Sequence, residues 1–494
     1  MSEAFTADVA VVGAGVSGLL VASELVRAGR DVVVLERGTR ASHADQLAGD
    51  ASQTPPATAA HNDESPPDTE RYPWDYGYAV GGCSLRWSGV AVRLLPADFE
   101  LRSRYGVGRD WPIGYGELEP FYADAERILG VAGGPGAHTD QPAHPLSPSD
   151  RLLAERLAPY VPVPQARPSA ERNGRAPCTA LARCRLCPSD ARWSALHLLD
   201  DEQLDGHEGF RLLEATAAAR IRVRDDHAAV VEAVRADREH VEVRANEVVL
   251  AANAIENAAL LLRSDLDDGV AGRNLADHGH RLLHVECDVP TGAGYGASVT
   301  TGLSLAWADG PFRAQRAAAV LLPVNAGVEL SEVVTAQLAA GVRGAPVREA
   351  ARWRKEHTLV LDTLYEDLPD PRHRVELSPR RDALGLPLNR ITYSWGGSDY
   401  VRAAEAQLEQ DLGERLADIG GRLVHAAHTA LGGHQLGTCF MGAADGVVDA
   451  QERHHRIANL WVTGGSSFPA YSAMHPALTI AALALRLGRR LGAV

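Results

Sequence analysis

Cysteine and aromatic residues are scarce in this chain of 494 residues. Its 6 cysteines are too few for a disulfide scaffold in so long a chain. Aromatic residues make up 5% of the chain, which argues against a broad carbohydrate-stacking surface. No apolar run approaches the roughly 20 residues that span a bilayer, and the nearest, 478–491, is interrupted by arginine. We therefore expect no membrane span.

Basic residues are outnumbered by acidic ones. The chain has 49 Lys+Arg and 64 Asp+Glu, which gives a formal net charge of −15. Such a charge repels phosphate backbones and anionic membranes and favours neutral or cationic ligands, so nucleic-acid binding is not expected. The N-terminus lacks the basic and apolar regions of a signal peptide, which favours a cytoplasmic protein. The 45% hydrophobic content suffices for a large core, divided into two or more lobes.

A dinucleotide-binding βαβ unit is predicted at the N-terminus. The β-branched run Asp8–Val12 predicts a strand, the glycine-rich segment 13–18 a turn, and the apolar spacing of Leu19–Ala28 a helix. A second strand, Asp31–Glu36, ends in an acid about 20 residues beyond the glycines, where the dinucleotide-binding pattern has its acid.

Different residues of this unit are expected to bind different parts of the dinucleotide. Backbone N–H groups at the helix N-terminus bind the pyrophosphate, and the glutamate accepts hydrogen bonds from the adenosine ribose. A glutamate favours a free ribose over a 2′-phosphate, but the unit does not separate NAD from FAD. The predicted contacts are Gly13, Gly15, Gly18 and Glu36.

The C-terminal part of the chain contains an ordered series of motifs. They are Gly433–Thr438, Met441-Gly442, Gly446–Asp449, Asn459–Pro469 and His475–Ile480. Their order and spacing resemble the signature end of the glucose–methanol–choline (GMC) oxidoreductases. This resemblance is highly specific for the family and uninformative about the substrate.

Three further strings support the resemblance. They are Asn246–Glu256, Gly272–His278 and Asp110–Glu126. The last points to the branch that contains pyranose oxidase and the flavin gluconate and glucose dehydrogenases. The chain departs from the family at Asn253-Ala254, where Gly-Ala is usual, and we expect slightly altered packing of the flavin domain there.

The resemblance implies that the cofactor is FAD. Pyranose oxidases attach the flavin to a histidine that precedes a tryptophan, whereas this chain has Arg86 before Trp87, which implies noncovalent FAD. The further cofactor contacts that it implies are Gly82, Ser84, Trp87, Ser88, Gly89, Ala252, Gly464, Gly465, His475, Pro476 and Leu478.

Oxidation of an alcohol requires a base for the hydroxyl proton, while the α-hydrogen leaves as hydride to flavin N5. The two active-site positions of the family map onto His434 and His475. We assign His434 as the general base and His475 as the partner that orients the substrate oxygen, although the sequence alone is also compatible with the reverse.

Pro476 can begin a helix that continues over 477–491. The N-terminus of such a helix directs positive dipole toward whatever lies beside His475. In the family this is the pyrimidine edge of the flavin, so the dipole would stabilise the anionic reduced flavin.

Three cysteines, Cys178, Cys184 and Cys187, lie close together and precede Pro188. Related flavin dehydrogenases hold an iron–sulfur cluster in this segment, and three thiolates suit a three-iron cluster that relays electrons outward. Other family members keep cysteines here without a known cluster. A cluster, a zinc site and a plain structural loop stay open, and the working expectation is that no metal is bound.

Two groups of histidines were also considered as sites. A strand would place His278, His280 and His284 on one face, as a metal site needs, but no acidic partner is evident and we expect no metal. His454 and His455 fall in a polar stretch, for which a solvated turn is predicted.

The predicted fold class is α/β, or α+β overall, with a Rossmann-like FAD-binding domain and a discontinuous substrate domain built on an antiparallel sheet. Segment 41–71 has little to bury and is expected to be a mobile insertion. The predicted domains are 1–40, 72–110, 205–285 and 430–494 for FAD binding, 111–204 as a helical and cysteine-containing connection, and 286–429 for the substrate.

The predicted function is FAD-dependent oxidation of a CH–OH group in a small polar substrate: a sugar, aminosugar or glycoside. The electron acceptor is oxygen or another, unidentified one. Glu329, Glu332 and Glu366 are candidate contacts for substrate amines. The alternatives are an iron–sulfur flavin dehydrogenase that passes electrons to a protein or quinone, a redox-silent FAD lyase, and a nicotinamide-dependent enzyme, which would be colourless.

Overall fold

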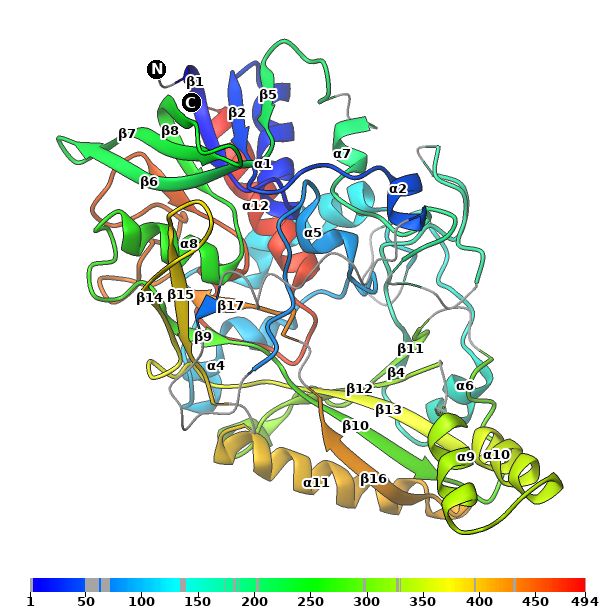
Figure 1. Ribbon diagram of the computed structural model, residues 1–494. Coiled ribbons are helices and arrows are strands. Elements are labelled where there is room, and N and C mark those ends of the chain that lie inside the picture. The colour runs from blue at the N-terminus through cyan, green and yellow to red at the C-terminus, as the bar shows by residue number, and fades with distance from the viewer. Residues whose placement is uncertain are drawn as a thin grey trace.

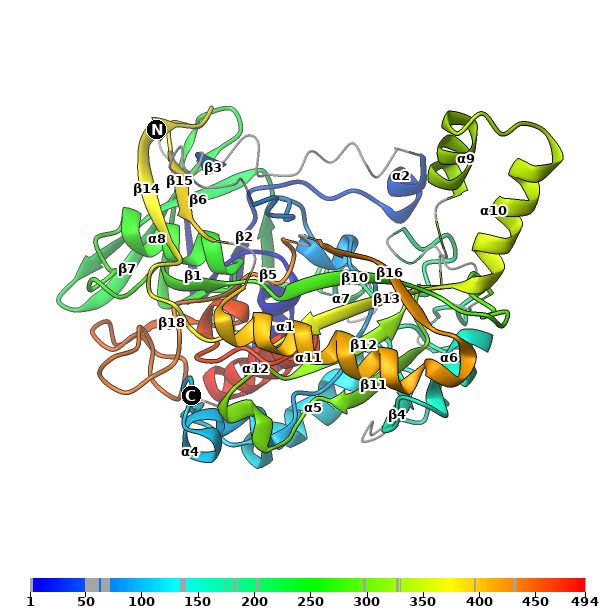
Figure 2. The ribbon, with the colours of Figure 1, turned by 90° about the horizontal axis from the view of Figure 1, so that it is seen from below.

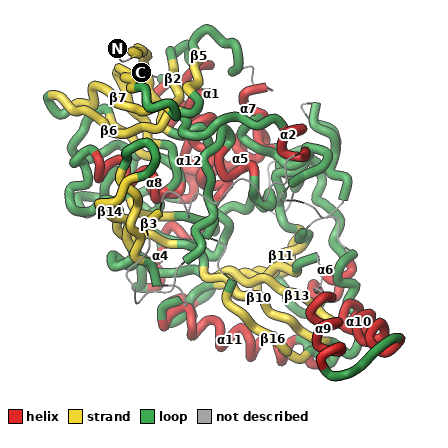
Figure 3. Tube along the Cα trace, viewed as in Figure 1, coloured by secondary structure: helices red, strands yellow, loops and turns green. Residues whose placement is uncertain are grey.

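The computed structural model contains two sheet-based bodies that lie one above the other (Figure 1). Both ends of the chain belong to the upper body, although Figure 2 shows them well apart, and Figure 3 marks the strands and helices of this body. No helix of the described residues is long and apolar enough to cross a membrane. The structure describes residues 3–48, 62–63, 72–133, 139–172, 174–180, 184, 186–200, 204–295, 299–325, 328, 330–394, 397–429 and 432–493.

The upper body is built on a 7-stranded sheet in the order β5-β2-β1-β8-β7-β6, with β18 paired to β8. Strands β5, β2, β1, β8 and β18 pair in parallel, whereas β6, β7 and β8 pair antiparallel. Its strands are β1 (Glu3–Val12), β2 (Val32–Leu35), β5 (Phe210–Leu213), β6 (Thr216–Arg224), β7 (His227–Arg235), β8 (His240–Leu250) and β18 (Leu460–Val462).

Helices cover this sheet and pack against it through their own buried apolar faces. The C-terminal helix contacts both α1 and α5, and a Cβ added at Gly488 would lie 2.8 Å from Glu24 Cβ, so glycine permits the close approach of α12 to α1. The helices of this body are α1 (Val16–Arg27), α5 (Tyr115–Leu129), α7 (His197–Asp200), α8 (Ala254–Arg263) and α12 (Ala477–Gly492).

The lower body is a 6-stranded sheet in the order β16-β10-β13-β12-β11-β4, and every neighbouring pair is antiparallel. Helix α11 (Asp399–Arg415) lies along its outer face in both Figure 1 and Figure 2. Leu283, Leu361 and Leu408 join the buried cluster between sheet and helix. The strands are β4 (Tyr160–Pro162), β10 (Gly279–Glu286), β11 (Gly302–Trp307), β12 (Ala319–Pro323), β13 (Thr358–Tyr365) and β16 (Arg422–His428).

A third sheet of 5 strands, in the order β17-β9-β14-β15-β3, lies beside α8. Its strands are β3 (Asn62–Asp63), β9 (Arg273–Ala276), β14 (Arg374–Arg381), β15 (Pro387–Thr392) and β17 (Leu436–Thr438). The remaining helices are α2 (His43–Ala48), α4 (Leu101–Tyr105), α6 (Pro148–Ala154), α9 (Leu330–Ala339) and α10 (Ala345–His357).

The predicted fold class is confirmed, because a Rossmann-like sheet and an antiparallel sheet are both present. The domain boundaries stay a prediction: β10 runs through the expected division at 285/286, and β4 comes from the expected connecting region. Of the predicted insertion 41–71, only 41–48 and 62–63 lie within the described residues.

The prediction of a solvated turn is wrong for His454, which is 2% exposed. Its Nδ1 accepts hydrogen bonds from the backbone N–H groups of Arg456 and Ile457, and its Nε2 lies 3.1 Å from Leu266 O. The imidazole thus replaces water as the partner of the turn backbone, whereas His455 is exposed.

Candidate active site

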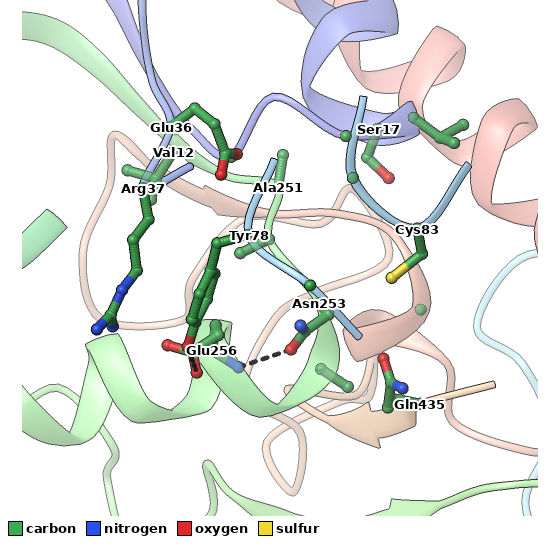
Figure 4. Close-up of a pocket in the computed structure, with 18 of the residues that line it drawn as sticks. Val12, Ser17, Glu36, Arg37, Tyr78, Cys83, Ala251, Asn253, Glu256 and Gln435 are labelled. Carbon is green, nitrogen blue, oxygen red and sulfur yellow. Dashed lines mark hydrogen bonds between the residues drawn. The ribbon is translucent and has the colours of Figure 1, made fainter. Parts of the chain in front are cut away.

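A cleft runs from the end of β2 to the start of α12, between the glycine loop and α8 (Figure 4). It brings together segments that are far apart in the sequence. The predicted site residues that line it are Gly13, Gly15, Glu36, Gly82, Ser84, Ala252, His434, Gly465 and Pro476. The predicted residues outside its lining are Gly18, Trp87, Ser88, Gly89, Gly464, His475 and Leu478.

Two glycines of the glycine loop leave no room for a side chain. Gly13 has φ +104°, and a Cβ there would lie 2.9 Å from Ala251 O. A Cβ on Gly18 would lie 1.8 Å from Gly13 O, so this glycine permits close packing of helix and strand. Gly15 is the N-cap of α1 and provides no side-chain cap, so the first N–H groups of the helix can receive an anion.

Glu36 lies at the end of β2 and is 7% exposed. Its two carboxylate oxygens accept hydrogen bonds from Ala14 N at 2.9 Å and Gly38 N at 2.8 Å. Burial raises the pKa of Glu36, and these hydrogen bonds only partly offset the effect. Each oxygen has a second lone pair, so the carboxylate can also accept ribose hydroxyls.

Sequence reasoning missed the polar groups near this end of the cleft. The Arg37 guanidinium lies 4.4 Å from the centroid of the Tyr78 ring, and Tyr78 donates a 2.8 Å hydrogen bond to Glu256. Asn253, noted only as a departure from the family, is the N-cap of α8 and accepts from Ile255 N and Glu256 N. A capping signal, Asn followed three residues later by Glu, was available in the sequence.

The predicted segment Trp87–Gly89 packs against the connecting region. Trp87 Nε1 donates to Trp193 O at 2.9 Å, and the buried Arg192 donates to Trp87 O. A Cβ on Gly89 would lie 3.3 Å from Arg192 Cγ. These contacts stabilise the segment against Arg192 and Trp193, and Arg192 also lies near Cys184 and Cys187.

Four histidines meet at the other end of the cleft. The ring centroid of His434 lies 4.9 Å from that of His278, 6.0 Å from that of His280 and 5.4 Å from that of His475. His278 and His280 flank the start of β10, and His475 immediately precedes the Pro476 N-cap of α12. The structure therefore adds two histidines to the pair that the sequence assigned.

The hydrogen bonds of this cluster fix a tautomer. His278 Nε2 lies 2.5 Å from Ser472 O, and a carbonyl oxygen only accepts, so Nε2 carries the proton. Neutral His278 then offers a lone pair at Nδ1, which lies 2.9 Å from His434 Nδ1. His434 therefore donates from Nδ1, and its Nε2 is left as a proton acceptor.

Burial favours the neutral form of three of these imidazoles, those of His434, His278 and His475. Burial, followed by the nearby His280, lowers the pKa of His434 to about 3. Burial and the neighbouring His434 likewise lower the pKa of His278 to about 3, and the pKa of His475 is lowered well below its ordinary value. At neutral pH each can accept a proton or a hydrogen bond.

Asp277 organises the backbone of the cluster. One of its oxygens accepts from His278 N and His434 N, both at 3.0 Å, and the other accepts from Tyr72 Oη. Asp277, His278 and His434 form the one group of the described residues whose possible metal-ligand atoms lie within 4.8 Å of one another. Because protein hydrogen bonds use these atoms, we assign them no metal.

The histidines considered as a metal site are separated by the fold. His284 packs against His425, with ring centroids 5.2 Å apart, and does not join His278 and His280. Contact of the candidate acids with substrate amines stays a prediction: Glu366 is fully buried in an ion pair with Arg313, Glu332 lies exposed on α9, and Glu329 lies outside the described residues.

Two of the three clustered cysteines contact a buried guanidinium. Arg167 Nη1 lies 3.3 Å from Cys178 Sγ and 3.4 Å from Cys184 Sγ, and Arg167 is 2% exposed. Burial lowers the pKa of the nearby Arg192 to about 10, although Cys187 and Cys184 oppose the shift. In the described part of this segment, no three ligand atoms lie within 4.8 Å of one another, so no single-ion site is preformed.

Comparison with family models gives two matches. Residues 369–484 match the model described as GMC oxidoreductase. Residues 8–111 match the model described as FAD dependent oxidoreductase. The first match contains His434 and His475, and the second contains the glycine loop and Glu36.

Two curated relatives are similar over nearly the whole chain. The fructose dehydrogenase large subunit of Gluconobacter japonicus is 31% identical, over 98% of this chain and 97% of the relative. Paromamine 6'-oxidase of Streptomyces fradiae is 31% identical, over 97% of this chain and 90% of the relative.

Among solved structures, pyridoxine 4-oxidase from Mesorbium loti shares the fold. It superposes with a TM-score of 0.67 and covers 98% of each chain at 21% identity. At this identity the likeness supports the arrangement of the sheets and helices alone.

Proposed function

Since this chain belongs to the GMC oxidoreductase family and is an FAD-dependent oxidoreductase that acts on CH–OH groups, we propose that its substrate is a sugar, aminosugar or glycoside. A relative that oxidises fructose and another that oxidises paromamine support this class. The net charge of −15 favours neutral or cationic members of it.

The cleft fits FAD along its length. Glu36 would bind the adenosine ribose, the loop of Gly13 and Gly15 the pyrophosphate, and Pro476 at the start of α12 the flavin. The other sequence-assigned contacts, including Leu478 in the buried face of α12, would support these positions. FAD, when bound, supplies the acceptor for the substrate hydride.

His434 is proposed as the general base, and its bare Nε2 is the observation that carries this assignment. A neutral imidazole can take the hydroxyl proton of the substrate, and its donated Nδ1–H fixes the ring plane. His475, whose ring lies beside that of His434, would hydrogen-bond the substrate oxygen and orient it.

The test is anaerobic flavin reduction by a panel of sugars, aminosugars and aminoglycosides. His434→Ala is expected to slow reduction by about 10²–10⁴-fold, the usual contribution of a positioned base, and by more than His475→Ala does. The matched control is the exposed His455→Ala. A larger loss at His475 would reverse the two roles, and a spectrum that no alcohol bleaches would favour the redox-silent lyase.

An iron–sulfur cluster on Cys178, Cys184 and Cys187 is the alternative cofactor arrangement. The buried Arg167, in contact with two of the sulfurs, is suited to an anionic group, and a cluster there would relay electrons to a protein or quinone. Iron analysis of anaerobically purified protein tests it, because active protein without iron eliminates it. Reoxidation by air, compared with reoxidation by a quinone, then identifies the electron acceptor.

A further inference from the structure

The antiparallel sheet turns one face toward the histidine cluster, and that face carries His280 and Asp362. Side chains alternate between the faces of a strand. Leu283 of β10 and Leu361 of β13 pack in the cluster beneath α11, whereas Leu364, the register partner of His280, joins the main core. His280 and Asp362 therefore share the inner face.

His280 and Asp362 form a hydrogen-bonded pair across neighbouring strands. His280 Nδ1 lies 2.9 Å from Asp362 Oδ1, and because a carboxylate oxygen accepts, Nδ1 carries the proton. Burial lowers the pKa of His280, but Asp362 and then Asp277 outweigh it, so the pKa is raised overall. His280 is thus the histidine of the cluster that most readily keeps a positive charge.

The other nitrogen of His280, Nε2, is buried. The side chain is 1% exposed, yet Nε2 has no hydrogen-bond partner within the described residues. An unpaired buried polar atom costs free energy unless a ligand or water satisfies it. The ring centroids of His280 and His434 lie 6.0 Å apart, so the pair adjoins the proposed base, although neither His280 nor Asp362 is among the residues that line the cleft.

Asp362 also has unused hydrogen-bonding capacity. Its side chain is 24% exposed, and its second oxygen accepts no hydrogen bond from the residues that the structure describes. Another carboxylate on the same face, Glu286, is already paired with Arg354. Among the described residues, His280 is the hydrogen-bond partner of the Asp362 side chain, and the second carboxylate oxygen is left to accept a cation from the substrate.

We propose that His280 and Asp362 form a subsite for an amino alcohol, in which His280 Nε2 hydrogen-bonds a substrate hydroxyl and the free oxygen of Asp362 binds an ammonium group. This proposal rests on the proposed oxidation at His434. It specifies amine-bearing sugars as the substrate class of that reaction. The subsite differs from the acids predicted from the sequence, of which Glu366 is paired with Arg313 and Glu332 lies exposed on α9.

The first variant is Asp362→Asn, which keeps an oxygen to accept from His280 Nδ1–H but removes the charge. Binding of glucosamine, glucose and N-acetylglucosamine is measured by perturbation of the flavin absorption in anaerobic holoenzyme. The Kd for glucosamine is expected to rise about 10- to 100-fold, as loss of a charged hydrogen bond implies, while that for the two neutral sugars changes less than about threefold. Wild-type protein that binds glucose as tightly as glucosamine overturns the proposal.

Two further variants separate recognition from damage to the fold. Asp362→Glu keeps the charge and is expected to retain preference for glucosamine, even if both affinities fall. Glu286→Gln removes a carboxylate from the same face of the same sheet and is expected to leave the preference unchanged. A preference lost equally in Asp362→Glu and Asp362→Asn, or lost in Glu286→Gln, contradicts a specific ammonium contact.

The His280 half of the subsite has its own readout. His280→Phe keeps a ring but removes Nε2, and it should weaken binding of glucosamine and glucose alike. Unchanged Kd values would remove His280 from the subsite. The proposed function fails separately: if the sugars perturb the flavin spectrum but no alcohol bleaches it, binding is retained and oxidation is not.

Discussion

His434 Nδ1 donates a hydrogen bond to His278 Nδ1 at 2.9 Å, although the two residues lie 156 positions apart in the sequence. The direction of that hydrogen bond follows from Ser472, whose carbonyl oxygen requires the proton of His278 on Nε2. His278 is therefore a positioning residue: it selects the tautomer in which His434 has a free Nε2.

The first prediction concerns this tautomer. His278→Leu removes the acceptor for His434 Nδ1–H, so the proton can move to Nε2 and the base is lost from part of the population. Anaerobic flavin reduction should slow by at least about tenfold, as for loss of other groups that orient a catalytic imidazole. His278→Gln, which retains an acceptor oxygen, should recover part of the rate. Equal losses in both variants would indicate a purely structural role.

The second prediction concerns pH. Because burial and the nearby His280 lower the pKa of His434 to about 3, its neutral form persists from neutral pH down to well below 6.5. Flavin reduction, measured in rapid pH jumps, should keep its rate as the pH falls from 6.5 to about 4 and then decline toward the pKa of the base. A decline centred near 6.5, the pKa of an ordinary histidine, would contradict this assignment.

The third prediction concerns the glycine loop. Gly18→Ala would place a Cβ 1.8 Å from Gly13 O, so α1 or the loop must move. We expect reduced FAD content and a loss of roughly 1–3 kcal/mol in the free energy of unfolding, typical of overpacking. Gly413→Ala in α11, where an added Cβ meets no atom within 4 Å, is the matched control and should retain FAD. Full FAD content in Gly18→Ala would argue against this loop as the pyrophosphate site.

The fourth prediction concerns the buried Arg313, which is 0% exposed and pairs with Asp98 and Glu366. Arg313→Met leaves two buried carboxylates without their cation, and urea unfolding should show a loss of about 3–5 kcal/mol. Arg220→Met, which breaks an exposed pair with Asp265, should change stability far less. Similar effects of the two substitutions would show that burial does not control the strength of these pairs.

Local patterns sufficed to predict the elements that are proposed to hold the cofactor. The glycines before α1 and the acid after β2 lie within one short βαβ unit, so their spacing alone identifies them. The helix that follows Pro476 was also predicted, and the structure places it at Ala477–Gly492. Resemblance to the family then supplied His434 and His475, which no periodicity singles out.

The sequence did not show which residues surround His434. His278 and His280 reach it through the turn between β9 and β10, and Asp362 reaches His280 through antiparallel pairing of β10 with β13. These are contacts between distant segments, fixed by the register of the sheet. A single sequence carries no signal for that register beyond alternating burial.

Strand β10 begins one residue after His278 and contains His280. This short segment therefore carries both the proposed positioning residue and one half of the proposed subsite. Any change that moves this segment to suit a new substrate also disturbs the base. Asp362, on the neighbouring strand, has no direct contact with His434 among the described residues. Under the proposed assignments, substrate range can diversify through β13, whereas β10 and the residue before it stay tied to the proposed base, so libraries that seek new specificities should vary β13 first.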